Sequence, residues 1–454
     1  MIKRPTHRVR NAFELLESIG EDAVGEYLPF YSPIDSSGRY LPYDEFRFRV
    51  PSGLNVDYAW QLRRLSRKNL SNEIIKLGAP EIQCTLYYTS NIQITISETD
   101  RFTTEAMLDW INNKFGESRG IQYLLNDLIE DESISSSQLE GAATTTIVAK
   151  NIIKNKASPR TVDERMIVGN FKLMMFAWEN RDAELTTDLI KEFHITGVSG
   201  IDDDSYHPGK FRKTENVVVT DREGNIVHQP PTYKGLSERL AKVSEWVNKS
   251  HNSGRDYLHP LVKAIILHFI IGYEHPFHDG NGRVARALFY WYMFKHGYHA
   301  FRYIAISTLL KKAPAKYGKS YLYTETDDMD LTYFVDYQCD VIKRAIDDFK
   351  EVYEKTLKKI EEFNVFVYSS GLLGSLSDRE KIIFQVASSS EYYEFTTNEV
   401  AKNLGCSYNT ASTSLNNLVK MGIFNKTKEG KEWIYRMNPH EEILGRWKNK
   451  RASW

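Results

Sequence analysis

The most constraining feature of the sequence is an apolar run that stops at a proline and gives way to a glycine-rich corner. Residues 264–273 read AIILHFIIGY, and residues 275–286 read HPFHDGNGRVAR. The run is too short to cross a bilayer, so it predicts a buried helix. This helix should end near Tyr273, because Pro276 prevents regular continuation. A second helix should begin at the glycines, so the chain needs a helical core with a sharp corner.

Arg283 and Arg286 place two cations in the first turns of that second helix. A helix N-terminus already carries about half a positive charge from its aligned peptide dipoles, so this arrangement is costly unless an anion binds there. Gly280, Asn281 and Gly282 tolerate the backbone angles that turn successive N–H groups inward to form an anion nest. The pattern therefore predicts a polyphosphate site.

Two neighbours of the nest carry reactive groups. Asp279 is an oxygen ligand suited to a Mg²⁺ ion that bridges phosphates, and His275 can accept a proton near neutral pH. Two alternatives stay open: His275 can be structural, and His278 with Asp279 can belong to a transition-metal site. The stretch AKYGKS at 315–320 imitates the end of a P-loop, but its required first glycine is an alanine, so we interpret it as a chance match.

Composition limits the other possibilities. The chain has 454 residues, of which 41% are hydrophobic and 26% charged, and this predicts two to four globular domains. A net charge of −1 means that binding to nucleic acid needs a local patch. Three scattered cysteines (Cys84, Cys339 and Cys406) indicate a reducing compartment. With neither a signal peptide nor a membrane span in the sequence, we expect a cytoplasmic protein without membrane contact.

The N-terminal half divides into a mixed region and a helical core. Residues 1–102 contain no interpretable motif; packing on the helical core and a dimer contact are the two candidate roles. Within them, 81–97 has strand-like composition. Residues 103–358 repeat apolar positions at helical spacing, as in EAMLDWINNKF at 105–115. One stretch, 216–231, interrupts the helices and predicts a hairpin around a Glu-Gly-Asn turn.

The C-terminal part predicts a linker at 359–375, followed by a separate unit and tail at 376–454. Three helices, with a turn at Gly405, and a closing hairpin resemble a winged helix-turn-helix. Residues 396–437 are accordingly a candidate DNA-binding surface, with short polar side chains on the third helix and lysines on the wing: Asn409, Thr410, Ser412, Thr413, Asn416, Asn417, Lys426, Lys428 and Lys431. Protein docking or dimerisation is the alternative.

The corner sequence resembles the signature of the Fic family, HPFx(D/E)GNGRxxR, at every specified position. The helices predicted over 103–358 fit a Fic core in order and spacing. The resemblance implies a mainly α fold and AMPylation, the transfer of AMP from Mg-ATP to a Tyr, Thr or Ser hydroxyl of a protein, including the enzyme itself. The implied roles are: His275, base for the attacking hydroxyl; Asp279, Mg²⁺ ligand; Gly280, Asn281 and Gly282, phosphate cradle; Arg283 and Arg286, pyrophosphate binding.

The resemblance also implies roles around the corner. The hairpin at 216–231 corresponds to the family's flap, which docks the target segment by strand-like pairing; its candidate residues are Val217, Val218, Val219 and His228. Gly209 and Arg212 occupy the approach to that flap. Tyr317 and Tyr321 lie where the family often places residues beside adenine.

A second motif predicts an inhibitory segment. The stretch SSSQLEG at 135–141 resembles the family's inhibitory (S/T)xxxE(G/N) pattern, with Ser136 and Glu140 in its fixed positions. The resemblance implies a helix near 133–146 whose Glu140 pairs with Arg286 and competes with the γ-phosphate. Two alternatives remain: Glu140 can be an ordinary exposed charge, or it can orient water for removing AMP. A third class of function is a DNA-binding regulator whose Fic core only senses ATP.

Overall fold

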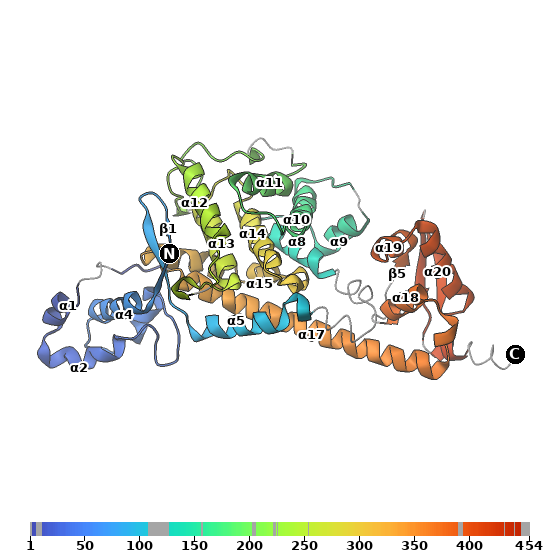
Figure 1. Ribbon diagram of the computed structural model, residues 1–454, viewed down its shortest axis with the longest axis horizontal. Helices are drawn as coiled ribbons and strands as arrows, with labels where there is room; N and C mark the ends of the chain where they lie inside the picture. Colours follow the sequence, from blue (N-terminus) through green and yellow to red (C-terminus); the bar gives the residue numbers. More distant parts are fainter. Residues whose placement is uncertain are drawn as a thin grey trace.

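Three bodies succeed one another along the molecule (Figure 1), and the three largest clusters of buried hydrophobic side chains lie in them. In this computed structural model they are formed mainly by helices, which confirms the predicted mainly α class. The largest body contains the predicted corner. The structure describes these residues: 2–5, 11–107, 127–155, 158–201, 206–220, 224, 226–252, 254–388, 394–430, 432–439 and 441–445.

The N-terminal body consists of short helices packed on one longer helix. That helix, α4, is capped by Asn55, whose side chain accepts hydrogen bonds from the backbone N–H groups of Asp57 and Tyr58. A hairpin follows it, with β1 and β2 antiparallel. The elements are α1 (Ala12–Ile19), α2 (Val24–Tyr27), α3 (Tyr43–Phe46), α4 (Val56–Leu70), β1 (Asn72–Leu77) and β2 (Ile82–Leu86).

The strand prediction for 81–97 is correct only for its first part. Beyond Leu86 the chain forms helix α5 (Ser90–Phe102). Thr89 starts this helix by accepting a hydrogen bond from the N–H of Ile92, and the residues that it buries, Ile92, Thr95 and Thr99, recur at helical spacing. The β-branched residues that suggest a strand here are overridden by packing against α17.

The central body is a helical assembly around α13 and α14, which are buried on nearly every face. The sequence-based segment 105–115 lies largely outside the described residues. The elements are α8 (Asp127–Leu139), α9 (Thr146–Asn155), α10 (Val162–Glu179), α11 (Thr187–Gly197), β3 (Val219–Thr220), β4 (Ile226–His228), α12 (Leu236–Asn248), α13 (Pro260–Glu274), α14 (Asn281–Lys295), α15 (Ile306–Lys312), α16 (Pro314–Thr326) and α17 (Thr332–Ser370).

Two of these elements settle smaller questions. The P-loop-like stretch 315–320 lies inside helix α16, so it forms no phosphate-binding loop. The predicted hairpin is present as the antiparallel pair β3–β4, although of its Glu-Gly-Asn turn only Gly224 is described. Within the described chain, none of the helices combines the length and hydrophobicity needed to cross a membrane.

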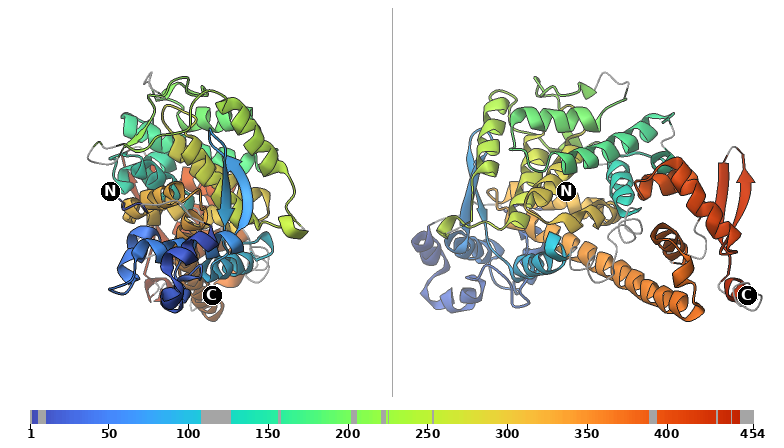
Figure 2. Two further views of the ribbon diagram at one scale, coloured as in Figure 1. Left: turned by 90° about the vertical axis from the view of Figure 1, so that its left-hand side faces the viewer. Right: turned by 45° about the vertical axis from the view of Figure 1, so that its right-hand side comes forward.

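Helix α17 joins the central and C-terminal bodies (Figures 1 and 2). Its 39 residues span roughly 58 Å at the usual helical rise. It occupies residues 359–370, most of the predicted linker, and ends at Gly371, whose φ of 73° favours glycine. Residues 359–370 of the predicted linker are therefore helical, although the stretch NVFVY at 364–368 consists of only moderate helix formers; Val367 there packs into the core of the C-terminal body.

The C-terminal body contains the three predicted helices and the closing hairpin, with one strand that the sequence did not suggest. This strand, β5, pairs with β7, which gives the order β5–β7–β6. Lys431 lies outside the described residues. The elements are α18 (Asp378–Ser388), β5 (Glu394–Thr396), α19 (Thr397–Asn403), α20 (Tyr408–Lys420), β6 (Phe424–Glu429) and β7 (Glu432–Met437).

Candidate functional site

The predicted corner joins the end of α13 to the start of α14. His275 caps α13 with a φ of 44°, and Gly280 precedes α14 with a φ of 81°. Gly280 thus has the left-handed conformation expected of a nest glycine. The Asn281 side chain clamps the loop, because it accepts from Phe277 N and donates to Phe277 O, each at 2.8 Å.

Gly282 differs from the prediction. It lies in the helix without a positive φ, so backbone freedom is not what this position requires. A β-carbon at Gly282 would lie 2.2 Å from Glu140 Oε1 and 3.1 Å from Arg286 Nη1. The missing side chain therefore allows an acidic group to lie directly against the first turn of α14, where free N–H groups attract anions.

His275 is partly exposed, and its ring is held in one tautomer. Nδ1 lies 3.2 Å from the carbonyl of Gly272, and a carbonyl only accepts, so Nδ1 carries the hydrogen and Nε2 keeps a lone pair. Desolvation lowers the pKa of His275 to about 4, against opposing effects that include the charge of Glu140. The imidazole is therefore neutral at pH 7 and can accept a proton at Nε2.

Arg212, which the sequence placed near the flap, holds the backbone of the corner. It is 2% exposed. Its backbone N–H donates to Pro276 O at 2.8 Å and its Nε to His275 O at 2.9 Å. Its Nη2 donates to Glu274 O at 3.2 Å and to Pro231 O, beyond the β3–β4 hairpin. One guanidinium thus connects the corner to the hairpin.

His194 of α11 is a site residue that the sequence reasoning missed. Its Nδ1 accepts from Gly209 N at 3.0 Å, so its Nε2 donates to Asp279 O at 2.9 Å. The ring stacks on Phe277 at 3.9 Å, and burial lowers the pKa of His194 to about 4. A histidine on the otherwise apolar buried face of this helix was the available signal.

Arg283 is buried with donors left over. It is 1% exposed, and its Nη1 donates to Gly197 O at 3.0 Å. Within the part of the chain that the structure describes, its Nε and Nη2 have no hydrogen-bond partner. Buried guanidinium donors without partners are costly. The N–H groups on these two nitrogens fit an anion that would satisfy them.

Arg286 is engaged by the predicted inhibitory segment. Its Nη2 lies 2.7 Å from Glu140 Oε1 and donates to Ser136 O at 3.1 Å, while its Nε donates to Ser136 Oγ at 2.9 Å. Burial raises the pKa of Glu140, but the charge and hydrogen bond of Arg286 outweigh this effect and hold it below its ordinary value. The expected ion pair is present, at the end of α8 rather than inside the helix.

Asp279 remains accessible. Its side chain is 48% exposed, its Oδ1 accepts from Gly280 N, and it lies 4.0 Å from Arg283 Nη2. Among the described residues no group of three His, Cys, Asp or Glu side chains could hold a metal, so the transition-metal alternative has no ligand set there. A Mg²⁺ ion needs only one or two carboxylates when phosphates and waters supply the other ligands, and Asp279 fits that requirement.

The flap candidates divide by burial. Val217 and His228 are 9% and 7% exposed, and His228 contacts Glu325 Oε2 at 2.8 Å and Tyr273 O at 2.9 Å. Their side chains anchor the hairpin and are not free for a target. Val218 and Val219 are partly exposed, so of the four candidates these two side chains remain accessible to a target segment that pairs with the hairpin's backbone.

Tyr317 and Tyr321 lie in an aromatic cluster beside α13. The hydroxyl of Tyr317 is 2.7 Å from His268 Nε2. The ring of Tyr321 packs against Gly272, where a β-carbon would lie 2.5 Å from its hydroxyl. Both residues therefore support the helix that carries His275, and their role beside adenine stays a prediction.

Sequence comparisons show which known proteins this chain resembles. Residues 184–293 match the model of the Fic/DOC family. Protein adenylyltransferase Fic of Drosophila virilis is 26% identical over 165 residues, 35% of this chain and 32% of that protein. The protein of the same name from Nematostella vectensis is 26% identical over 162 residues, 34% of each chain. The chain thus spans about a third of the length of these curated relatives.

Solved structures also resemble this chain. A Fic family protein from Desulfovibrio desulfuricans G20 is 18% identical, with a TM-score of 0.47, and the match covers 77% of this chain and 97% of that one. Fic-1 from C. elegans is 17% identical, with a TM-score of 0.46, covering 69% and 81%. The matched family segment, 184–293, includes the corner but neither Glu140 nor the C-terminal body.

Proposed function

We propose that this chain is an auto-inhibited protein adenylyltransferase, which transfers AMP from Mg-ATP to a hydroxyl side chain of a protein. The observation that carries the proposal is the charge arrangement at the start of α14. There, two buried arginines have donors without partners among the described residues, and the carboxylate that pairs with Arg286 is that of Glu140. The Fic/DOC match over 184–293 and the adenylyltransferase names of the distant relatives support the same activity.

The chemistry assigned to each residue follows from its geometry. His275 Nε2 takes the proton of the target hydroxyl while the hydroxyl oxygen attacks the α-phosphorus, and pyrophosphate leaves. Arg283 and Arg286 bind the departing phosphates, together with the N–H groups at the start of α14. Mg²⁺ held by Asp279 would neutralise phosphate charge. Serine, threonine or tyrosine can each supply the hydroxyl.

Mass spectrometry after incubation with Mg-ATP tests the proposal. A gain of one AMP on a Tyr, Thr or Ser of this chain, or of a co-purified protein, is the expected result. ATP binding with no such gain in any variant, including one without Glu140, would leave the ATP-sensing regulator as the better description. Loss of AMP from a pre-modified target would instead favour the reverse reaction.

The pH dependence should be flat across the neutral range. Because desolvation lowers the pKa of His275 to about 4, its base form is already complete at pH 6, and raising the pH adds nothing. We expect single-turnover AMP transfer by a Glu140-free variant to hold from pH 8 to 5.5 and to fall only towards pH 4. Half-loss near 6.5, the ordinary histidine value, would contradict a desolvated, neutral imidazole.

We also propose that the C-terminal body binds duplex DNA through α20 and the wing. Asn409 and Thr413 are exposed on α20, and Lys428 is exposed on β6. Other candidates are already occupied: Asn416 contacts Lys426 at 2.8 Å and Asn417 contacts Glu380 at 3.0 Å. The patch is therefore small, and docking on a protein is the alternative.

A retardation assay at 50 mM salt should show weak binding that is lost by 200 mM, because phosphate contacts release counterions. Lys428→Ala should weaken it, while Lys350→Ala, on α17 in the central body, should not. No retardation of any duplex at low salt would leave protein docking as the role of this body.

A further inference from the structure

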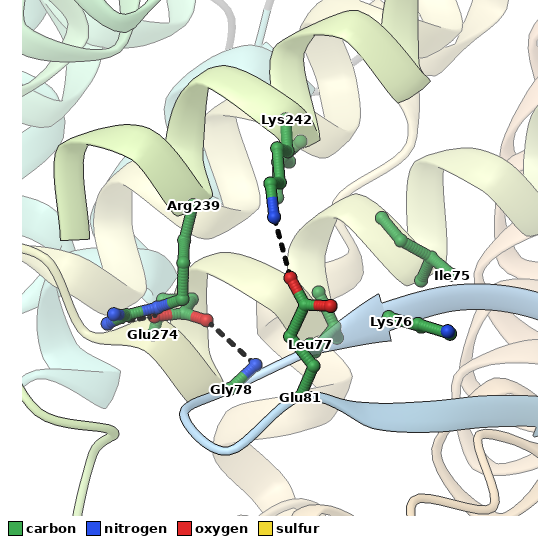
Figure 3. A pocket seen from close by; sticks show the side chains of 9 residues that line it. Ile75, Lys76, Leu77, Gly78, Glu81, Arg239, Lys242 and Glu274 are labelled. Carbon is green, nitrogen blue, oxygen red and sulfur yellow. Dashed lines mark hydrogen bonds and ion pairs between the residues drawn. The ribbon is translucent and has the colours of Figure 1, made fainter. Parts of the chain in front are cut away.

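A cavity of about 260 Å³ lies between the tip of hairpin β1–β2 and helices α12 and α13 (Figure 3). One of its walls is the carboxylate of Glu274, which is 0% exposed and directly precedes His275. Arg239 Nε and Nη2 each lie 2.9 Å from Glu274 Oε2, and Gly78 N donates to Oε1 at 3.3 Å. Figure 3 shows the carboxylate between these two partners.

We propose that Glu274 is a positioning residue for His275, and that hairpin β1–β2 takes part in holding it through Gly78. This inference rests on the function proposed above and deepens it. Through Gly78, the N-terminal region, in which the sequence shows no motif, would contribute to the same site.

The backbone of His275 explains why such a support is needed. A residue with a β-carbon is disfavoured at a φ of 44° and keeps that conformation only when its surroundings fix it. Buried donors hold the carbonyls on this stretch: His228 holds Tyr273 O, and Arg212 holds those of Glu274 and His275. Glu274 adds a side-chain anchor to these backbone contacts, because its carboxylate is held by Arg239 and by the N–H of Gly78.

Arg239 connects that anchor to a third segment. Its Nη2 donates to Thr232 O at 2.7 Å and its Nη1 to Lys234 O at 2.9 Å, in the chain that follows hairpin β3–β4. Glu274 therefore neutralises the guanidinium that holds the segment directly after the proposed target-docking flap. A change at Glu274 should therefore disturb both the general base, His275, and the docking hairpin.

The absence of a side chain at Gly78 allows the hairpin backbone to lie close to α13. Its φ is 85°, and a β-carbon there would lie 2.8 Å from the hydroxyl of Tyr273. Glycine at this tip lets the backbone N–H reach Glu274. The hairpin thus contacts two consecutive residues before His275, one through a hydrogen bond and one through packing.

The same cavity offers a matched control. Glu81 on β1–β2 pairs with Lys242 of α12 at 2.7 Å, but these side chains are 46% and 67% exposed. They bridge the same two elements without touching the corner. An exposed pair contributes little to stability, so its loss should leave His275 unaffected.

Glu274→Gln, in a background lacking Glu140, tests the proposal by activity. The amide keeps the shape but removes the charge that Arg239 requires. We expect kcat for AMP transfer to fall at least tenfold, with the ATP dissociation constant unchanged within twofold. Glu81→Gln should change neither. If Glu274→Gln fails to fold, the double variant Arg239→Gln/Glu274→Gln removes both buried charges and gives the same kcat test.

A second readout does not depend on AMP transfer. Diethyl pyrocarbonate modifies neutral imidazoles, and mass spectrometry can follow each histidine. Glu274→Gln should change the rate at His275 at least fivefold and leave the rate at His278, which is also partly exposed, within twofold. If the Glu140-free background transfers no AMP, the proposed function fails, and this rate alone then decides the positioning role. An unchanged rate at His275, or equal changes at both histidines, overturns the proposal.

Discussion

AMP incorporation should rise about 100-fold when Glu140 is replaced by glycine. In the wild type the carboxylate holds Arg286 at 2.7 Å and lies against Gly282, where the proposed mechanism requires the phosphates of ATP. Misplacing a reacting group by about an ångström can cost on the order of a hundredfold in rate. Radiolabelled ATP and gel autoradiography of the two proteins measure the ratio.

The matched control is Asp131→Asn. Asp131 lies on the same helix, α8, but its carboxylate pairs with Lys150, at 2.8 Å, and not with Arg286. This variant tests whether any loosening of α8 activates the protein, and we expect its incorporation to equal the wild type. If Glu140→Gly and the wild type incorporate equally little AMP, Glu140 is no brake and the exposed-charge interpretation stands.

The same variant has a stability signature. Without Glu140, Arg286 keeps its bonds to Ser136 but loses its carboxylate partner, and losing a hydrogen bond to a charged group costs roughly 1–3 kcal/mol. ATP supplies a replacement anion, and a ligand that binds only the folded state raises its stability. The rise in melting temperature on adding Mg-ATP should therefore be larger for Glu140→Gly than for the wild type. This comparison is independent of AMP transfer.

The predictable parts of the site are those written in local sequence. Gly280 needs a left-handed backbone, the arginines share one helix face, and the Ser136–Glu140 spacing matches a motif. The parts that failed depend on distant packing. Thr89 and the surface of α17 turn strand-like residues into helix α5, and His194 reaches Asp279 from 85 positions away. No local pattern encodes the contact of Gly78 with Glu274.

Removing the base should have the second large effect. In the Glu140→Gly background, His275→Ala should reduce AMP transfer by about 10²–10⁴, the usual contribution of a positioned general base. ATP binding should persist within about twofold, because the phosphates contact α14 and its arginines. Single-turnover mass spectrometry gives the rate, and calorimetry gives the binding constant.

Backbone strain makes the choice of substitution matter. Alanine at a φ of 44° costs roughly 1–2 kcal/mol more than in the right-handed region, so His275→Ala can disturb the corner as well as remove the base. Asparagine tolerates that conformation and cannot act as a base at neutral pH, so His275→Asn separates the two effects. Both variants should be equally inactive. His278 lies in the same loop, with its ring 4.8 Å from that of His207, and the His278→Ala variant should keep its activity. Transfer by His275→Asn at the background rate would mean that the proton leaves the target by another route.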